Sequence, residues 1–132
     1  MIIATDFDGV LCENRWPGIG ALNKKLIKRL ADLKSEGHII ILWTCRTDDP
    51  FTDERTGKTR NLLDEAVDFC ASYGLTFSCI NEPDPESIKL FSGNPRKIYA
   101  NLYIDDNNAG DEFMKKYGIP FIKGMTYQEQ AL

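Results

Sequence analysis

The sequence predicts an α/β protein with a three-layer, Rossmann-like arrangement, in which a parallel sheet lies between two layers of helices. Two observations predict it. Short apolar segments alternate with amphipathic ones along the chain, and two of the apolar segments end in acidic residues. Strands that alternate with helices form parallel sheets. Right-handed crossovers then bring the carboxyl ends of the strands to one edge, where ligands bind in such sheets.

Four apolar segments are predicted to form the strands of the sheet. The segment 38–44 is nearly continuous in apolar residues, which is typical of a parallel strand covered on both faces. The other predicted strands are residues 2–5, 75–80 and 98–104, and residues 121–122 are a candidate edge strand. The stretches between them, including residues 45–60, are polar and are predicted as loops where they lack helical periodicity.

Helical periodicity appears in two longer segments and two short ones. Around residues 22–34, apolar residues recur three and four positions apart, and Gly37 follows as a stop signal. A second helix is predicted over about 60–73, with Gly74 after it. Its predicted inward face consists of Leu63, Ala66, Val67, Cys70 and Tyr73. One helical turn is expected near 86–90 and a short helix near 111–117.

Length, charge and cysteine content exclude several classes of protein. The 132 residues are predicted to form one domain, and the net charge of −4 argues against a general nucleic-acid binder. No apolar run approaches the roughly 20 residues that span a bilayer, and the first strand is not preceded by a signal sequence. The cysteines show no C-x-x-C spacing, so we expect reduced thiols and a cytoplasmic location. They are Cys12, Cys45, Cys70 and Cys79.

The segment Asp6-Phe7-Asp8-Gly9 directly after the first strand is the most informative motif. Side chains alternate along a strand, so Asp6 and Asp8 are predicted to point to one place while Phe7 turns away. Two carboxylates that close repel each other unless a cation lies between them. Oxygen ligands suit Mg²⁺. The motif therefore predicts a magnesium site.

Polar residues at other strand ends are predicted to lie near this motif. Thr44 ends the second strand, and Asp105 and Asp106 follow a later one. These positions share the carboxyl edge of a parallel sheet with Asp6. Lys97 precedes its strand, so its side chain has to reach the same edge from the incoming loop.

Taken in order, four segments resemble the haloacid dehalogenase superfamily of phosphohydrolases. They are Asp6-Phe7-Asp8-Gly9, Trp43-Thr44-Cys45-Arg46, Arg96-Lys97 and Ile104-Asp105-Asp106, and the match extends over essentially the whole chain. The second acid of the first motif favours phosphoryl over carbon–halogen chemistry. The stretches where cap domains are inserted in this superfamily are only residues 7–20 and 81–96, so the resemblance implies a small, capless member.

The resemblance implies a role for each matching residue. Asp6 would be the nucleophile, and Asp8 would protonate the leaving oxygen and then activate water. Thr44 would bind the phosphoryl group, and Lys97 would neutralise the Asp6–phosphate pair. Asp106, with Asp105 beside it, would hold Mg²⁺ together with Asp6 and the backbone carbonyl of Asp8. These cations would allow a carboxylate to attack a phosphate dianion.

The substrate is expected to be a small phosphorylated molecule. Gly9, Cys45 and Arg46 are the expected substrate contacts, and Trp16-Pro17 is a candidate apolar wall for the leaving group. Sugar phosphates, nucleotides, phosphorylated lipid precursors and polynucleotide ends all remain open. An uncapped site is open to bulky substrates or is closed by a second copy in a homo-oligomer.

Two alternatives belong to a different class of function. A two-component receiver domain also combines a parallel sheet with an acidic pair, a Thr and a Lys, but it carries its acceptor Asp after the third strand, where this chain has Ile80-Asn81-Glu82. A degenerate superfamily member would bind without turnover, although every expected catalytic group is present. Hydrolysis of an aryl phosphate with Mg²⁺ separates both alternatives from the phosphatase.

Overall fold

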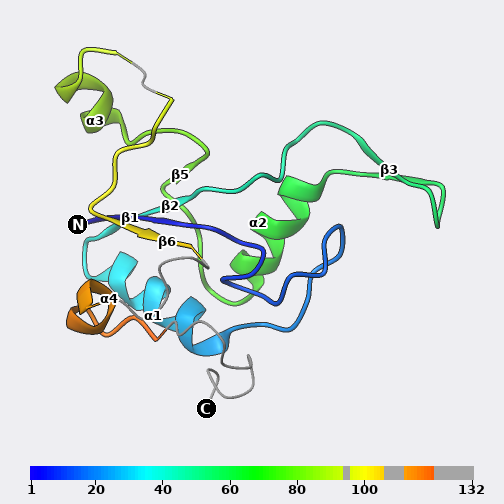
Figure 1. Cartoon of the computed structure of the whole chain (residues 1–132), viewed down its shortest axis with the longest axis horizontal. Helices are drawn as coiled ribbons and strands as arrows, with labels where there is room; N and C mark the ends of the chain where they lie inside the picture. The colour runs from blue at the N-terminus through cyan, green and yellow to red at the C-terminus, as the bar shows by residue number, and fades with distance from the viewer. Residues whose placement is uncertain (94–95, 106–111, 121–132) are drawn as a thin grey trace.

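The computed structural model describes residues 1–93, 96–105 and 112–120, and its centre is a four-stranded parallel sheet (Figure 1). The strand order is β5-β2-β1-β6. The strands are β1 (Ile2–Thr5), β2 (Ile39–Leu42), β5 (Cys79–Ile80) and β6 (Leu102–Ile104). The sheet and its helices confirm the α/β, Rossmann-like class. The candidate strand at 121–122 lies outside the described residues.

The register of the sheet aligns the carboxyl ends of its strands. Thr5, the last residue of β1, pairs with Leu42 at the end of β2 and with Ile104 at the end of β6. Leu42 pairs in turn with Ile80 at the end of β5. The residues that follow these strands therefore leave the sheet along one edge, as expected for parallel strands.

Side chains alternate between the two faces of the sheet and fill two apolar clusters. The larger cluster contains Ile3 of β1 and Leu42 of β2, with residues of α1, α2 and α4. The smaller cluster contains Ala4 and Ile41 from the same strands, with Ile98 and Ala100 of the segment before β6. Figure 1 shows α1 and α4 on one side of the strands and α3 on the other.

The helices are α1 (Lys24–Ser35), α2 (Leu62–Ser72), α3 (Pro85–Leu90) and α4 (Glu112–Lys116). The first two begin about two residues later than predicted, because Asn23 and Asn61 cap them by accepting hydrogen bonds from Leu26 N and Asp64 N. The inward placement predicted for Tyr73 is wrong. Tyr73 is the C-cap of α2 and is exposed, since the helical spacing ends before it.

A β-hairpin occupies part of the stretch that the sequence predicted as a loop. Its strands are β3 (Phe51–Asp53) and β4 (Lys58–Arg60), paired antiparallel. Gly57 N donates to Asp53 O at 2.7 Å, and Gly57 has φ +69°, so the turn uses the one residue that adopts this conformation without strain.

Among the helices of the described ranges, none is long and apolar enough to cross a membrane.

Candidate active site

Asp6 lies at the carboxyl end of the inner strand β1, and both its backbone N–H and its carboxylate make hydrogen bonds with nearby backbone groups. Asp6 N donates to Ile104 O at 3.0 Å, and Asp6 Oδ1 accepts from Phe7 N at 2.7 Å. Phe7 is fully buried in the larger cluster, which confirms that it turns away from the site. The carboxylate of Asp6 is thereby held at the sheet edge.

A tight turn after Asp6 presents Asp8 and Gly9 to the same place. Phe7 O accepts hydrogen bonds from Val10 N (3.2 Å) and Leu11 N (2.9 Å). Gly9 N donates to Cys12 O at 2.9 Å, and Gly9 has φ +83°. A side chain at position 9 would be strained in this left-handed conformation.

One cavity of about 460 Å³ collects most of the predicted site residues. Asp6, Asp8 and Gly9 line it from the first strand end, and Thr44 and Cys45 line it from the second. Asn14 and Trp16 complete the lining from the loop before α1. Sequence reasoning named Trp16 as a wall but missed Asn14, because a polar residue inside a loop carries no positional signal.

Asp8 does not point freely into this cavity but is paired with Arg46. Arg46 Nε and Nη2 donate to the two carboxylate oxygens of Asp8, both at 2.8 Å. The side chain of Arg46 is 0% exposed and that of Asp8 is 16% exposed. Parallel two-point contact between guanidinium and carboxylate is the strong, directional form of an ion pair.

The remaining N–H groups of Arg46 hold backbone segments around the site. Its Nη2 donates to Gly18 O (2.8 Å), and its Nη1 donates to Pro17 O (3.4 Å) and Leu62 O (3.3 Å). The guanidinium also lies 5.0 Å from the centroid of the Phe7 ring. Arg46 thus lies beneath the site, where it joins Asp8 to the loop before α1 and to the start of α2. Its predicted contact with substrate stays a prediction.

Thr44 is held by a residue that sequence reasoning missed. Thr44 N donates to Asn81 Oδ1 at 2.8 Å, and Asn81 Nδ2 donates to Arg46 O at 3.4 Å. Thr44 Oγ1 accepts from Arg46 N at 3.1 Å. Asn81 follows β5 directly, so its place at a strand end was the signal that could have identified it.

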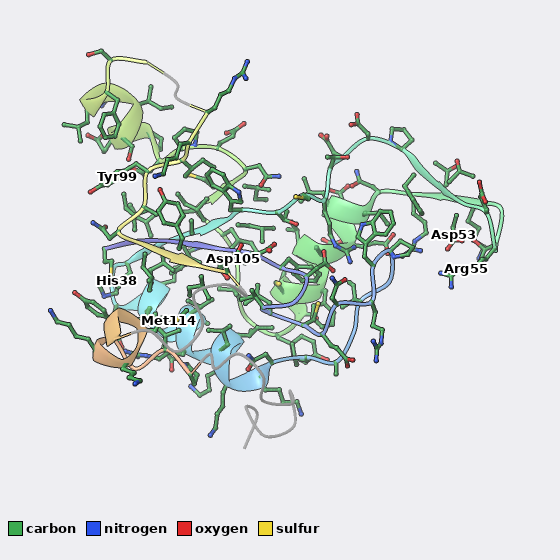
Figure 2. The ribbon with its side chains drawn as sticks, viewed as in Figure 1. His38, Asp53, Arg55, Tyr99, Asp105 and Met114 are labelled. Carbon is green, nitrogen blue, oxygen red and sulfur yellow. The ribbon has the colours of Figure 1, made fainter. Side chains whose placement is uncertain are left out.

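Asp105 shares a second, smaller cavity with Asp6. This cavity of about 80 Å³ is lined by Ala4, Asp6, Trp43, Tyr103, Ile104 and Asp105. Figure 2 shows Asp105 at the end of β6, at the same sheet edge as the end of β1. Asp106, the predicted direct metal ligand, lies outside the described residues.

Two carboxylates among the described residues could hold a metal ion. Two carboxylates, Asp6 and Asp105, line one small cavity, and oxygen donors of this kind suit Mg²⁺. Within the described ranges no cluster of three or more His, Cys, Asp or Glu side chains forms. The carboxylate of Asp8 is paired with Arg46, so the backbone carbonyl of Asp8 rather than its side chain fits the metal-ligand role that the resemblance implies.

Lys97 lies in a neighbouring cavity. Its ammonium is 5.8 Å from the centroid of the Tyr103 ring, and it lines a cavity of about 390 Å³ with Phe91, Tyr99, Ala100 and Tyr103. Of the described cavities that contain Asp6, neither has Lys97 on its lining. Tyr103 contributes to both this cavity and the one that holds Asp105.

The cysteines near the site differ in their environment. All four are unpaired thiols, and Cys45 is exposed at the cavity while Cys12 is buried below it. Burial raises the pKa of the Cys12 thiol to about 11, with a smaller contribution from the Asp8 charge. Cys12 is therefore a neutral thiol at physiological pH and packs as a small apolar group.

Comparison with known proteins yields one solved relative. No family model matches the chain, and neither does any curated protein. The chain is similar to the solved structure of a conserved protein from Bacteroides thetaiotaomicron, with 36% sequence identity and a TM-score of 0.66. The alignment covers 89% of this chain and 86% of the other.

Proposed function

The chain belongs to the family of that conserved Bacteroides thetaiotaomicron protein, and from the geometry of the sheet edge we propose that it is a Mg²⁺-dependent phosphohydrolase of the haloacid dehalogenase type. It would cleave an organic phosphomonoester through an aspartyl-phosphate on Asp6. The observation that carries the proposal is the cavity of about 460 Å³, in which Asp6, Asp8 and Thr44 come together at the carboxyl end of the central strand.

In the first half-reaction, a carboxylate oxygen of Asp6 attacks phosphorus and the bond from phosphorus to the leaving oxygen breaks. The hydrogen bond from Phe7 N to Asp6 Oδ1 fixes the orientation of the carboxylate for this attack. Thr44 lines the same cavity, and its hydroxyl would contact the phosphoryl oxygens. Asp6 and Asp105 would hold Mg²⁺, which would supply the positive charge that offsets repulsion between carboxylate and phosphate.

In the second half-reaction, water attacks the aspartyl-phosphate and gives up a proton. Asp8 accepts hydrogen bonds on both oxygens from Arg46, so it is held as an acceptor beside Asp6. That arrangement suits the removal of a proton from water. Donation to the leaving oxygen in the first half-reaction uses the same carboxyl group in its protonated form. The proton taken from water restores that form for the next cycle.

A hydrolysis screen with Mg²⁺ tests the proposal. We expect purified protein to release inorganic phosphate from p-nitrophenyl phosphate and from a subset of a panel of phosphorylated metabolites. Asp6→Asn serves as the matched control for contaminating phosphatase. A folded wild-type protein that hydrolyses nothing on the panel would leave a phosphoryl-accepting or binding domain as the better description.

A further inference from the structure

Trp16 is the most exposed large apolar residue around the site. It is 54% exposed and lines three separate cavities. One of them is the cavity that contains Asp6 and Asp8, and the other two lie along the hairpin β3–β4. The exposed indole leaves apolar surface in water directly beside the carboxylates of the site.

The loop that carries Trp16 is firmly held. Pro17 O accepts from Arg46 Nη1 (3.4 Å) and from Arg60 Nη2 (3.3 Å), and Gly18 O accepts from Arg46 Nη2 (2.8 Å). Trp16 N donates to Asn14 Oδ1 at 3.3 Å. The contacts from Arg46 and Arg60 come from residues far away in the sequence, so the loop that carries the indole is held before any ligand arrives.

Phe51 of the hairpin supports the indole from one side. The two ring centroids are 5.3 Å apart and the rings are inclined by 70°, an edge-to-face arrangement. Figure 1 shows the loop before α1 beside β3, which brings these two segments together. Trp16 and Phe51 also line the same cavity next to the hairpin. Together they form an aromatic corner at the rim of the site.

The size and lining of the cavity indicate what this corner binds. About 460 Å³ is more room than a phosphoryl group needs, so part of the leaving group lies inside. Several polar side chains of the lining already make hydrogen bonds within the protein, since Asp8 is paired with Arg46, Asn14 Oδ1 accepts from Trp16 N and Thr44 Oγ1 accepts from Arg46 N. A hydroxyl-rich leaving group would need several polar partners here, whereas a flat apolar ring needs only the indole.

We propose that Trp16, supported by Phe51, binds a planar aromatic group in the leaving alcohol of the substrate. The preferred substrates would then be phosphomonoesters with an aryl or nucleobase ring close to the phosphate. This inference rests on the proposed phosphohydrolase function, because the phosphoryl group has to lie at Asp6 for the ring to reach Trp16.

Binding of non-hydrolysable phosphonates separates this subsite from the phosphate site. The dissociation constants of benzylphosphonate, cyclohexylmethylphosphonate and ethylphosphonate are measured by calorimetry with Mg²⁺. In Trp16→Ala we expect about a tenfold weaker binding of benzylphosphonate, which is the size of one aromatic contact, and a change of less than about twofold for ethylphosphonate. Trp16→Phe should keep most of the affinity for benzylphosphonate. Phe91→Ala, an equally exposed ring on a different cavity, is the matched control and should change neither constant.

Three other binding results would contradict the aromatic subsite, its preference for aromatic rings, or the phosphate site. Equal weakening of benzylphosphonate and ethylphosphonate in Trp16→Ala would overturn the subsite while leaving the phosphate site intact. Equal weakening of the benzyl and cyclohexylmethyl compounds would show a general apolar contact and overturn the aromatic preference. If the wild-type protein binds none of the three phosphonates, the phosphate site itself is wrong, and the proposed function fails together with the subsite.

Discussion

Asp8 and Arg46 form an ion pair, and the Arg46 side chain has no access to water. The Arg46 side chain is fully buried, and its guanidinium donates to Asp8 and to backbone carbonyls of the surrounding segments. Taking a guanidinium out of water is costly, and the two-point contact with Asp8 offsets that cost. A substitution that breaks the pair is therefore expected to change both the position of the Asp8 carboxylate and the free energy of unfolding.

Arg46→Gln should destabilise the protein by about 3 kcal/mol, because removal of one partner leaves the other partly buried and uncompensated. Arg46→Lys should be intermediate, since an ammonium cannot make the two-point contact. Urea unfolding followed by circular dichroism measures the change. Arg55→Gln is the control: Arg55 pairs with Asp53 but its side chain is 78% exposed, so a change within about 0.5 kcal/mol is expected. Equal effects of the two Gln variants would contradict the account of Arg46.

Removal of the metal should abolish turnover, and addition of Mg²⁺ should restore it. Asp105 lines the small cavity with Asp6, so Asp105→Asn should raise the Mg²⁺ concentration needed for half-maximal activity by about tenfold, within the range seen when a residue around a metal is removed. Asp49→Asn is the control, since Asp49 lines only the cavity beside the hairpin. Full activity after exhaustive chelation would remove the metal from the mechanism.

The sequence predicted the location of a site residue best where that residue lies close to the end of a strand. Asp6, Asp8 and Thr44 lie within three residues of a strand end, and the structure brings all three to one cavity. Arg46 was predicted at the same edge, but a position four residues beyond β2 does not reveal whether the side chain turns outward or inward. Its inward direction depends on carbonyl groups of residues far away in the sequence, which no local pattern shows.

At the scale of elements, the hairpin β3–β4 is attached to the body through Arg60. Arg60 Nη2 donates to Glu65 Oε1 of α2 at 2.6 Å and to Pro17 O at 3.3 Å, and its Nη1 donates to Asp53 Oδ2 at 3.3 Å. The hydrogen bond from Arg60 lowers the pKa of Glu65. The pKa of Asp53 is lowered mainly by the backbone N–H of Arg55, which Figure 2 shows beside it at the hairpin turn.

These lowered pKa values predict acid-sensitive attachment of the hairpin. A carboxyl group with a lower pKa in the folded state contributes stability above its unfolded pKa of about 4, and that contribution is lost as the pH falls through the folded value. Amide exchange over residues 51–60, corrected for its intrinsic pH dependence, should therefore speed up below about pH 4. Arg60→Gln should weaken this dependence, because it removes the hydrogen bond that lowers the pKa of Glu65, whereas Lys58→Gln in the same strand should keep it. A hairpin whose protection is independent of pH in the wild type would contradict the attachment.

The sequence did not predict the hairpin as an element, and the reason lies in its composition. Asp48, Asp49, Asp53 and Glu54 make the stretch read as a solvated loop. What stabilises it is tertiary: the edge-to-face contact of Phe51 with Trp16 and the contacts of Arg60. The helices, by contrast, carry their own periodicity and were predicted to within about two residues at each end.

At the scale of the whole molecule, the sheet could be predicted because its two apolar clusters follow from the alternation of side chains along β1 and β2. Only part of each predicted strand pairs. Leu75 is buried in the larger cluster without belonging to β5, and Ile98 packs in the smaller cluster before β6 begins. Apolar runs predict burial, but pairing also depends on the direction of the chain, which the run does not specify.

Two buried thiols predict a loss of stability at alkaline pH. Burial raises the pKa of Cys12 to about 11 and that of Cys70 to about 12. Both values lie above the unfolded pKa of about 8.5, so the unfolded state releases protons first, and the stability present below that pH decreases as the pH rises toward the folded values.

Urea unfolding between pH 8 and 10.5 measures this dependence. Each thiol contributes a slope of up to about 1.4 kcal/mol per pH unit, so Cys70→Ala, despite its lower overall stability, should show a shallower decline than the wild type. Cys45→Ala is the control because Cys45 is exposed, and its slope should match the wild type. Identical slopes in all three proteins would contradict the burial of Cys70.

Asp6 is proposed to attack the phosphoryl group, and the turnover of Asp6→Asn is the sharpest test of that role. The amide has nearly the shape of the carboxylate and still accepts the hydrogen bond from Phe7 N, but it is not a nucleophile toward phosphorus. With p-nitrophenyl phosphate and saturating Mg²⁺, the account predicts that kcat falls by at least about 10³-fold while the circular dichroism spectrum and urea midpoint stay close to those of the wild type. A folded Asp6→Asn protein that turns over at the wild-type rate would contradict it.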